Sequence, residues 1–217
     1  MPVVKRYRGA QSFLPTQRSL PALRDAAQAC RGCPLYRDAT QAVFGEGPTN
    51  ADAVFVGEVP GDVEDRQGHP FVGPAGHLLD EALHAAGIAR DRVYLTNAVK
   101  HFKFTRRGKR RIHDKPTRYE VTACKPWLAS ELELIEPQIV VVLGATAAQA
   151  LLGNQFRITQ ERGKDLGEHD ALAPHVFATM HPAAVLRAPD PLARKTSRER
   201  FFADIALVGD TLRSLAK

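Results

Sequence analysis

Four short apolar runs constrain the fold more than any other feature of this 217-residue sequence. They are rich in valine and continuous rather than alternating in polarity, which is typical of strands that are covered on both faces in a parallel sheet. Helical patterns separate them, so strands and helices alternate along the chain. The runs are ADAVFVGE (51–58), RVYLTNAV (92–99), QIVVVLG (138–144) and HVFATMHP (175–182).

This alternation predicts one α/β domain over residues 1–217, a three-layer α/β/α sandwich around a four-stranded, mainly parallel sheet. About residues 1–15 are expected to be mobile, as is much of the segment 102–117 after the second strand. Pro126 is expected to break the second of the predicted helices. These helices span residues 73–87, 118–137, 145–153 and 197–216.

Polar side chains gather where three of the four runs end. Glu58 ends the first run and Asp62 follows it, Asn97 lies near the end of the second, and His181 lies in the fourth. The carboxyl ends of parallel strands share one edge of the sheet, where ligands bind in open α/β folds. We therefore expect these four side chains to line one cleft.

The positive charge of the protein is concentrated in one segment. The whole chain has a formal charge of +6, while residues 100–118 alone contain nine lysines and arginines and one acid. A local basic patch of this kind is typical of a nucleic-acid binder, although a solvated basic loop fits the same pattern. His113 lies within it.

Other function classes find less support in the sequence. No apolar run approaches the length of a membrane span, and the N-terminus lacks the apolar segment of a secretory signal, so we expect a cytoplasmic protein without membrane contact. No P-loop or G-x-G-x-x-G motif follows any of the runs, which disfavours a phosphoryl-transfer or nucleotide-binding enzyme.

The three cysteines point to a metal or redox site rather than to disulfides. Cys30 and Cys33 form a C-x-x-C motif, and Cys124 lies far from them in the chain. In a reducing compartment this spacing is typical of a metal, cluster or redox site, with buried structural thiols as the alternative.

The motifs at these strand ends resemble those of the uracil-DNA glycosylase superfamily. The iron–sulfur family 4 enzymes share the outline, and the UdgX type, distinguished by KRRIH after the second strand, is the most similar. The resemblance implies that a deoxyuridine flips out of DNA into the cleft. The matching motifs are CRGCPLYRDATQAVFGEG, GEVPGDVEDRQGHPFVGPAG, YLTNAVKHFKF, KRRIH, ACKPWL, LGATAAQALLG and MHPAAVLR.

The resemblance implies that the substrate is bound by Phe71, Asn97, Gly57 and Val59 and that His181 is catalytic. Phe71 would stack on the flipped uracil. Asn97 offers both a donor and an acceptor, which suits the O4 and N3–H edge of uracil and mismatches cytosine. His181 would donate to uracil O2, where negative charge grows as the glycosidic bond breaks.

The resemblance also assigns His113 a chemical role. In UdgX proteins the loop histidine is understood to form a covalent bond to the sugar C1′, which traps the enzyme on DNA. Glu58 would orient and activate this histidine. Activation of water, or stabilisation of the sugar cation, is a second role for Glu58 or Asp62. Neighbouring cations should favour the neutral form of His113, which keeps a lone pair available.

The expected partner is uracil-containing DNA, with single strands accepted, and the protein is expected to be a monomer. Basic side chains should contact the phosphates. The candidates are Lys100, Lys103, Arg106, Arg107, Lys109, Arg110 and Arg111.

A [4Fe–4S] cluster is the cofactor that the resemblance implies. His101 occupies a position that is cysteine in family 4, so the ligand set would be Cys30, Cys33, His101 and Cys124. Zinc accepts the same three-cysteine, one-histidine set and remains the alternative. The role of the cluster should be structural, because uracil excision needs no electron transfer.

One departure from the UdgX pattern affects the first motif, which is usually GEQPG. Here it reads GEVPG, with Val59 replacing glutamine. If that glutamine helps to hold the basic segment, Val59 should loosen the segment and slow trapping. Ala183 and Ala184 also occupy positions where serines are common.

Two other functions fit the same motifs. A family 4 enzyme with turnover would release uracil and leave an abasic site without a protein–DNA adduct. A non-catalytic module would bind uracil-containing DNA and give neither product.

Overall fold

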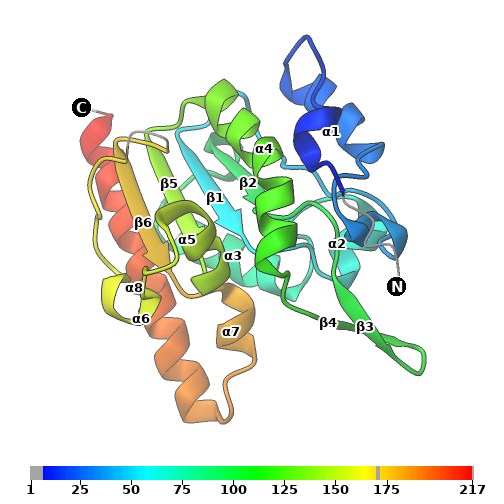
Figure 1. Cartoon of the computed structure of the whole chain (residues 1–217). Coiled ribbons are helices and arrows are strands. Elements are labelled where there is room, and N and C mark those ends of the chain that lie inside the picture. Colours follow the sequence, from blue (N-terminus) through cyan, green and yellow to red (C-terminus); the bar gives the residue numbers. More distant parts are fainter. Residues whose placement is uncertain (1–6, 170–171, 217) are drawn as a thin grey trace.

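The computed structural model in Figure 1 describes residues 7–169 and 172–216. Its central sheet has the strand order β2-β1-β5-β6, and every neighbouring pair is parallel. This confirms the predicted four-stranded sheet. The strands are β1 (Ala53–Gly57), β2 (Val93–Asn97), β5 (Ile139–Leu143) and β6 (His175–Thr179).

Successive strand residues face two different apolar cores. On β1, Val54 and Val56 belong to one core, while Ala53 and Phe55 belong to the other. Side chains alternate across a strand, so a run that is apolar at every position must be covered on both faces. The valine-rich runs thus explain why this sheet lies in the middle layer.

Helices cover both faces of the sheet and complete the predicted three layers (Figure 1). No helix within the described ranges is long and apolar enough to cross a membrane. The core on one face includes residues of α1 (Leu20–Gln28), α4 (Arg118–Ile135) and α5 (Ala145–Leu152). The core on the other includes residues of α3 (Pro74–Ala85), α7 (Pro182–Leu186) and α8 (Pro191–Leu215). Short elements in the connections are α2 (Asp62–Gln67), α6 (Ile158–Glu161), η1 (Ala10–Phe13), η2 (Pro34–Arg37) and η3 (Arg90–Arg92).

The helix α4 corrects one expectation, because it continues through Pro126. A proline inside a helix costs about 3 kcal/mol. The neighbouring Trp127 and Leu128 are buried, and the capping box of Thr117 and Glu120 fixes the start of the helix. Packing and capping therefore outweigh the lost hydrogen bond.

Two N-terminal features and one C-terminal feature also differ from the sequence-based expectations. Of the first 15 residues, 1–6 lie outside the described part, whereas Ala10 is buried in η1. Helix α1 was not expected. The last helix begins at Pro191 rather than at 197, because the Asp190 side chain accepts a hydrogen bond from Ala193 N at 2.8 Å.

The basic segment forms a hairpin instead of the expected mobile loop. Strands β3 (Phe104–Arg107) and β4 (Arg110–His113) pair antiparallel across a two-residue turn. Gly108 takes up the left-handed conformation there, with φ +58°. The hairpin projects from the body of the protein beside α2 (Figure 1). Its last residue is His113.

Candidate active site and nucleic-acid interface

A cavity of about 340 Å³ opens beyond the carboxyl ends of the parallel strands. Strand β1 has β2 on one side and β5 on the other. The connections that follow β1 and β5 therefore run in opposite directions from this edge of the sheet. Ligands bind at such switch points in open α/β sheets. The lining brings together seven of the predicted residues: Glu58, Val59, Asp62, Phe71, Asn97, His113 and His181.

Gly57 does not line the cavity, but it lies directly against two side chains that do, Asn97 and Phe71. It pairs with Asn97 across the sheet, and a Cβ atom on Gly57 would lie 2.3 Å from Asn97 Oδ1 and 2.8 Å from Phe71 Cζ. Phe71 has a φ of +58°, which is rare for a residue with a bulky side chain. Glycine at 57 and this unusual backbone together place the phenyl ring and the amide in one cavity wall.

His181 is held as a neutral hydrogen-bond donor. Its Nδ1 accepts a hydrogen bond from Ala183 N at 3.1 Å, so the ring proton resides on Nε2. Burial lowers the pKa of His181 to about 4, and the positive charge of Arg187 acts in the same direction. Its ring lies nearly parallel to that of Phe71, with 6.3 Å between the ring centroids.

His113 enters the cavity from the end of β4, next to Glu58. Burial lowers the pKa of His113, while the Glu58 carboxylate acts in the opposite direction. The main cause is therefore burial rather than the cations of the basic segment that the sequence suggested, and the one cation that adds to the lowering is Arg187, which lies outside that segment. Among the described residues, the buried Oε1 of Glu58 has no hydrogen-bond partner. That oxygen is available to a ligand or to a neighbouring imidazole.

Asp62 occupies the cavity wall but is already paired. Its carboxylate forms ion pairs with Arg111 and, at 3.1 Å, with Arg66. A carboxylate engaged in this way is a weaker candidate for activating water than Glu58, whose buried oxygen is unpaired. The geometry thus separates the two acidic residues that the sequence left as alternatives.

Three of the seven predicted phosphate contacts form ion pairs inside the protein, which makes them less available to DNA. The side chain of Arg111 is 8% exposed and pairs with Asp62 and Asp65. Lys103 pairs with Glu120 at 2.9 Å. The cations that remain exposed on the hairpin are Arg106, Arg107, Lys109 and Arg110.

Lys100 is the third of these paired cations. Its ammonium group is fully buried and lies 2.5 Å from Glu131, with further hydrogen bonds to Thr96 Oγ1 at 2.6 Å and Asn97 O at 2.9 Å. A lysine in this position neutralises a buried carboxylate and cannot reach a phosphate. It also fixes the backbone at Asn97, one wall of the cavity.

Val59 is 6% exposed and packs in the apolar core on the side of α4. The expected loosening of the hairpin is not tested by this contact. The hairpin is attached to the body through a different residue, Arg111, which pairs with α2.

The four predicted cluster ligands are all buried, but they come from different elements. Cys30 follows α1, Cys33 caps η2, Cys124 lies in α4 and His101 follows β2. Burial raises the pKa of Cys33 to about 11 and of Cys124 to about 12, and lowers that of His101 to about 4. Metal binding requires deprotonated thiols and a neutral imidazole, so loading this site would release protons from the cysteines.

Three thiols and one imidazole are suitable ligands for a metal centre, but in the described residues these side chains are too far apart to bind one ion together. Across the described ranges, no three cysteine, histidine or acidic side chains stand close enough together to hold one metal ion. The thiols are nevertheless near enough to influence one another, since the charges of Cys30 and Cys33 bear on the pKa of Cys124. A cluster of several irons and sulfides spaces its ligands more widely than one zinc ion does.

Sequence reasoning did not assign a role to several residues of the site, among them Arg187, Leu186 and Asp65. Arg187 and the half-exposed Leu186 line the cavity, and the fully buried Asp65 receives Arg111. Asp65 gave no signal, because an acid in the charged stretch DVEDRQ resembles a solvated helix face. Arg187 could have been found from its position directly after the MHPAAVL motif.

The chain is similar to known glycosylases over most of its length. Residues 44–206 match the family described as "Uracil DNA glycosylase superfamily". A "Type-4 uracil-DNA glycosylase" of Thermotoga maritima is 41% identical over 75% of this chain and 81% of the relative. One of Sulfurisphaera tokodaii is 38% identical over 84% and 82%. A "Type-5 uracil-DNA glycosylase" of Thermus thermophilus is 33% identical over 58% and 60%.

Proposed function

The chain belongs to the uracil DNA glycosylase superfamily, and from this premise we propose that it excises uracil from DNA and is then trapped by a covalent bond from His113 to the sugar C1′. The observation that carries the proposal is the position of His113 in the cavity beside Glu58, opposite His181. This position supports a role for the imidazole in the reaction.

Recognition of the base would rest on the cavity walls. A flipped uracil would stack on Phe71, and the Asn97 amide would complement its O4 and N3–H edge. The narrow space left by Gly57 keeps both groups against the base. Arg187, exposed where it lines the cavity, would attract the DNA phosphate.

Excision would depend on His181. When the bond from C1′ to N1 breaks, its electron pair leaves with uracil, and negative charge gathers on O2. The Nε2–H of His181 would donate to that oxygen, and because burial lowers the pKa of His181 to about 4, the imidazole is neutral at pH 7. A fixed donor of this kind stabilises the transition state.

Trapping would follow at the electron-poor C1′. An imidazole nitrogen of His113 would give its lone pair to C1′, and Glu58 would accept the proton from the other ring nitrogen. The lowered pKa of His113 leaves that lone pair free at neutral pH. Solvent then removes the proton from Glu58, which leaves a neutral covalent adduct.

A [4Fe–4S] cluster on Cys30, Cys33, Cys124 and His101 would hold the N-terminal segment against α4 and the residues that follow β2. When bound, it would supply structural cross-links and no step of the reaction. The similarity to the type-4 relatives supports a cluster more than zinc. We also propose a cytoplasmic monomer.

The decisive experiment mixes the protein with a uracil-containing single-stranded oligonucleotide and separates the products on a denaturing gel. A thymine oligonucleotide is the control. We expect a uracil-dependent band with the mass of both partners that survives boiling in detergent. His113→Ala should lose this band while it keeps DNA binding, and Glu58→Gln should slow its appearance.

Two other outcomes would replace the proposal. Alkali-labile abasic DNA without a shifted band would show a glycosylase with turnover, the activity named for the type-4 relatives. Retention on DNA with neither free uracil nor adduct would show a binding module without catalysis.

A further inference from the structure

The two faces of strand β4 carry different kinds of side chain. Arg111 and His113 are two residues apart and lie on one face of β4, where Arg111 pairs with α2 and His113 lines the cavity. Arg110 and Ile112 point to the opposite face and are exposed. The motif KRRIH therefore combines residues that can meet DNA with residues that contact the body of the protein.

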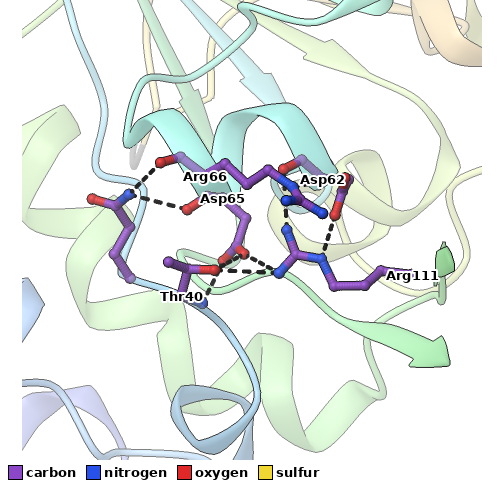
Figure 2. A network of polar contacts seen from close by, with 6 residues as sticks. Thr40, Asp62, Asp65, Arg66 and Arg111 are labelled. Carbon is purple, nitrogen blue, oxygen red and sulfur yellow. Dashed lines mark hydrogen bonds and ion pairs between the residues drawn. The ribbon is translucent and has the colours of Figure 1, made fainter. Parts of the chain in front are cut away.

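Arg111 connects the hairpin to two separate segments, as Figure 2 shows. Its Nε pairs with the Asp62 carboxylate, and its Nη2 lies 3.3 Å from Asp62 O, both at the start of α2. Its Nη1 lies 2.6 Å from Asp65 Oδ2 and 3.2 Å from Thr40 Oγ1. All of the guanidinium nitrogens thus have partners in the body of the protein.

Asp65 is prepared to receive this cation. Its carboxylate is fully buried and accepts hydrogen bonds from Thr40 N at 2.9 Å and from Thr40 Oγ1 at 2.6 Å. A buried carboxylate needs a counter-charge, so without Arg111 the charge of Asp65 would be uncompensated. The pair therefore favours the conformation in which the hairpin lies against α2.

The same arginine packs on the aromatic rings that support His113. The guanidinium carbon of Arg111 lies 5.3 Å from the ring centroid of Phe102 and 5.1 Å from that of Phe104. The Phe102 ring centroid in turn lies 6.2 Å from that of His113. Phe102 therefore lies between Arg111 and His113, so a displacement of Arg111 would change the packing around the His113 ring.

We propose that Arg111 is a positioning residue that holds hairpin β3–β4 against Asp62 and Asp65, so that His113 reaches C1′ before water does. An isolated two-stranded hairpin is marginally stable in water, so its position depends on such an anchor. The proposal rests on the proposed function.

The consequence is measurable as a ratio of products. After excision, the C1′ centre is captured either by His113, giving the adduct, or by water, giving an abasic site. A nucleophile that is held at the reacting distance gains a large effective concentration over one that moves freely. Releasing the hairpin should therefore lower the ratio of adduct to abasic site while uracil excision continues.

Arg111→Gln and Arg110→Gln are the matched pair for this test. Both remove one arginine from the same strand, but Arg110 is exposed. On a uracil oligonucleotide, we expect Arg111→Gln to lower the ratio of adduct to abasic site at least tenfold. Arg110→Gln should weaken DNA binding several-fold and leave the ratio as in the wild type. Arg111→Lys, which keeps the charge but not the fork of donors, should give an intermediate ratio.

An unchanged ratio in Arg111→Gln would overturn the proposal. If this variant does not fold, Asp65→Asn with Arg111→Met removes both charges together, and the same fall in the ratio is expected. Limited trypsin digestion of the free proteins gives a readout without DNA: faster cleavage within residues 106–110 of Arg111→Gln is expected, and equal rates would contradict the anchor. If the wild type forms no adduct, the proposed function fails, while the digestion still tests the anchor.

Discussion

Gly57 is the residue whose replacement should affect the cavity most directly. A methyl group there would lie 2.3 Å from Asn97 Oδ1 and 2.8 Å from Phe71 Cζ, so both recognition groups would have to shift. We expect Gly57→Ala to lower the rate of uracil excision about 100-fold, corresponding to about 2.7 kcal/mol of transition-state stabilisation. Single-turnover measurement of released uracil checks this.

A stability measurement distinguishes a local change in the cavity of Gly57→Ala from unfolding of the whole variant. Overpacking in a core costs about 1–3 kcal/mol. A thermal melt of Gly57→Ala should thus show a folded protein at 25 °C. A normal excision rate in a folded variant would mean that the wall formed by Phe71 and Asn97 does not contact the base.

His181 should make the protein less stable in acid. Its pKa is about 4 in the folded state, against an ordinary value of 6.5, so the unfolded chain binds the extra proton first as the pH falls. Stability from this residue is therefore complete above pH 6.5 and decreases between pH 6.5 and pH 4, by at most about 3 kcal/mol. Unfolding in urea across this range should show the decrease, and His181→Asn should show a smaller one.

At the level of single residues, the sequence predicted which side chains meet at the cavity better than it predicted which are exposed. Glu58, Asn97 and His181 follow strands whose apolar pattern fixes where they end, so their convergence was predictable. Arg110 and Arg111 are neighbours in sequence, yet one is exposed and the other is paired with Asp65. That difference depends on which face of β4 meets α2, a tertiary contact that local sequence does not contain.

The segment after β2 and helix α4 are connected by a buried ion pair whose contribution to stability can be measured. Lys100 and Glu131 are both fully buried, and Glu131 also accepts hydrogen bonds from Tyr94 and Thr96. Removal of one partner leaves a buried charge, which typically costs about 3–5 kcal/mol. We expect Lys100→Met to lose this much free energy of unfolding in urea.

Lys125→Met is the matched control, because Lys125 is exposed on α4. A surface substitution of this kind should change stability by no more than about 0.5 kcal/mol. If Lys100→Met were as stable as the wild type and instead bound DNA more weakly, Lys100 would be a phosphate contact, as the sequence suggested.

At the level of elements, the strands were predictable and the hairpin was not. A continuous apolar run such as IVVVL can only be accommodated between two helical layers. Strands β3 and β4 carry mostly charged residues and have no apolar alternation, so their sequence gives no strand signal. Partners outside the hairpin, above all Asp65, supply contacts that the segment itself cannot. The same reason explains α4, where tertiary packing outweighs Pro126.

For the whole molecule, the cysteine site should determine how the N-terminal segment is held. Cys30 and Cys33 belong to that segment, whereas Cys124 belongs to α4. Purified protein should contain about four irons and show broad visible absorption. Cys124→Ser should lose the colour and expose the segment to protease, because the connection between the two parts is gone. A colourless wild type with one zinc ion per chain would contradict the cluster.

The salt dependence of DNA binding measures how many cations of the hairpin reach the phosphates. On single-stranded DNA, each neutralised phosphate contributes about 0.7 to the slope of log affinity against log salt. The structure leaves four hairpin cations exposed: Arg106, Arg107, Lys109 and Arg110. Replacing all four with glutamine should therefore reduce the slope by about 3. Since Lys100, Lys103 and Arg111 are paired within the protein, they should contribute nothing to that slope. If replacing the four exposed cations left the slope unchanged, DNA would have to cross another face of the molecule.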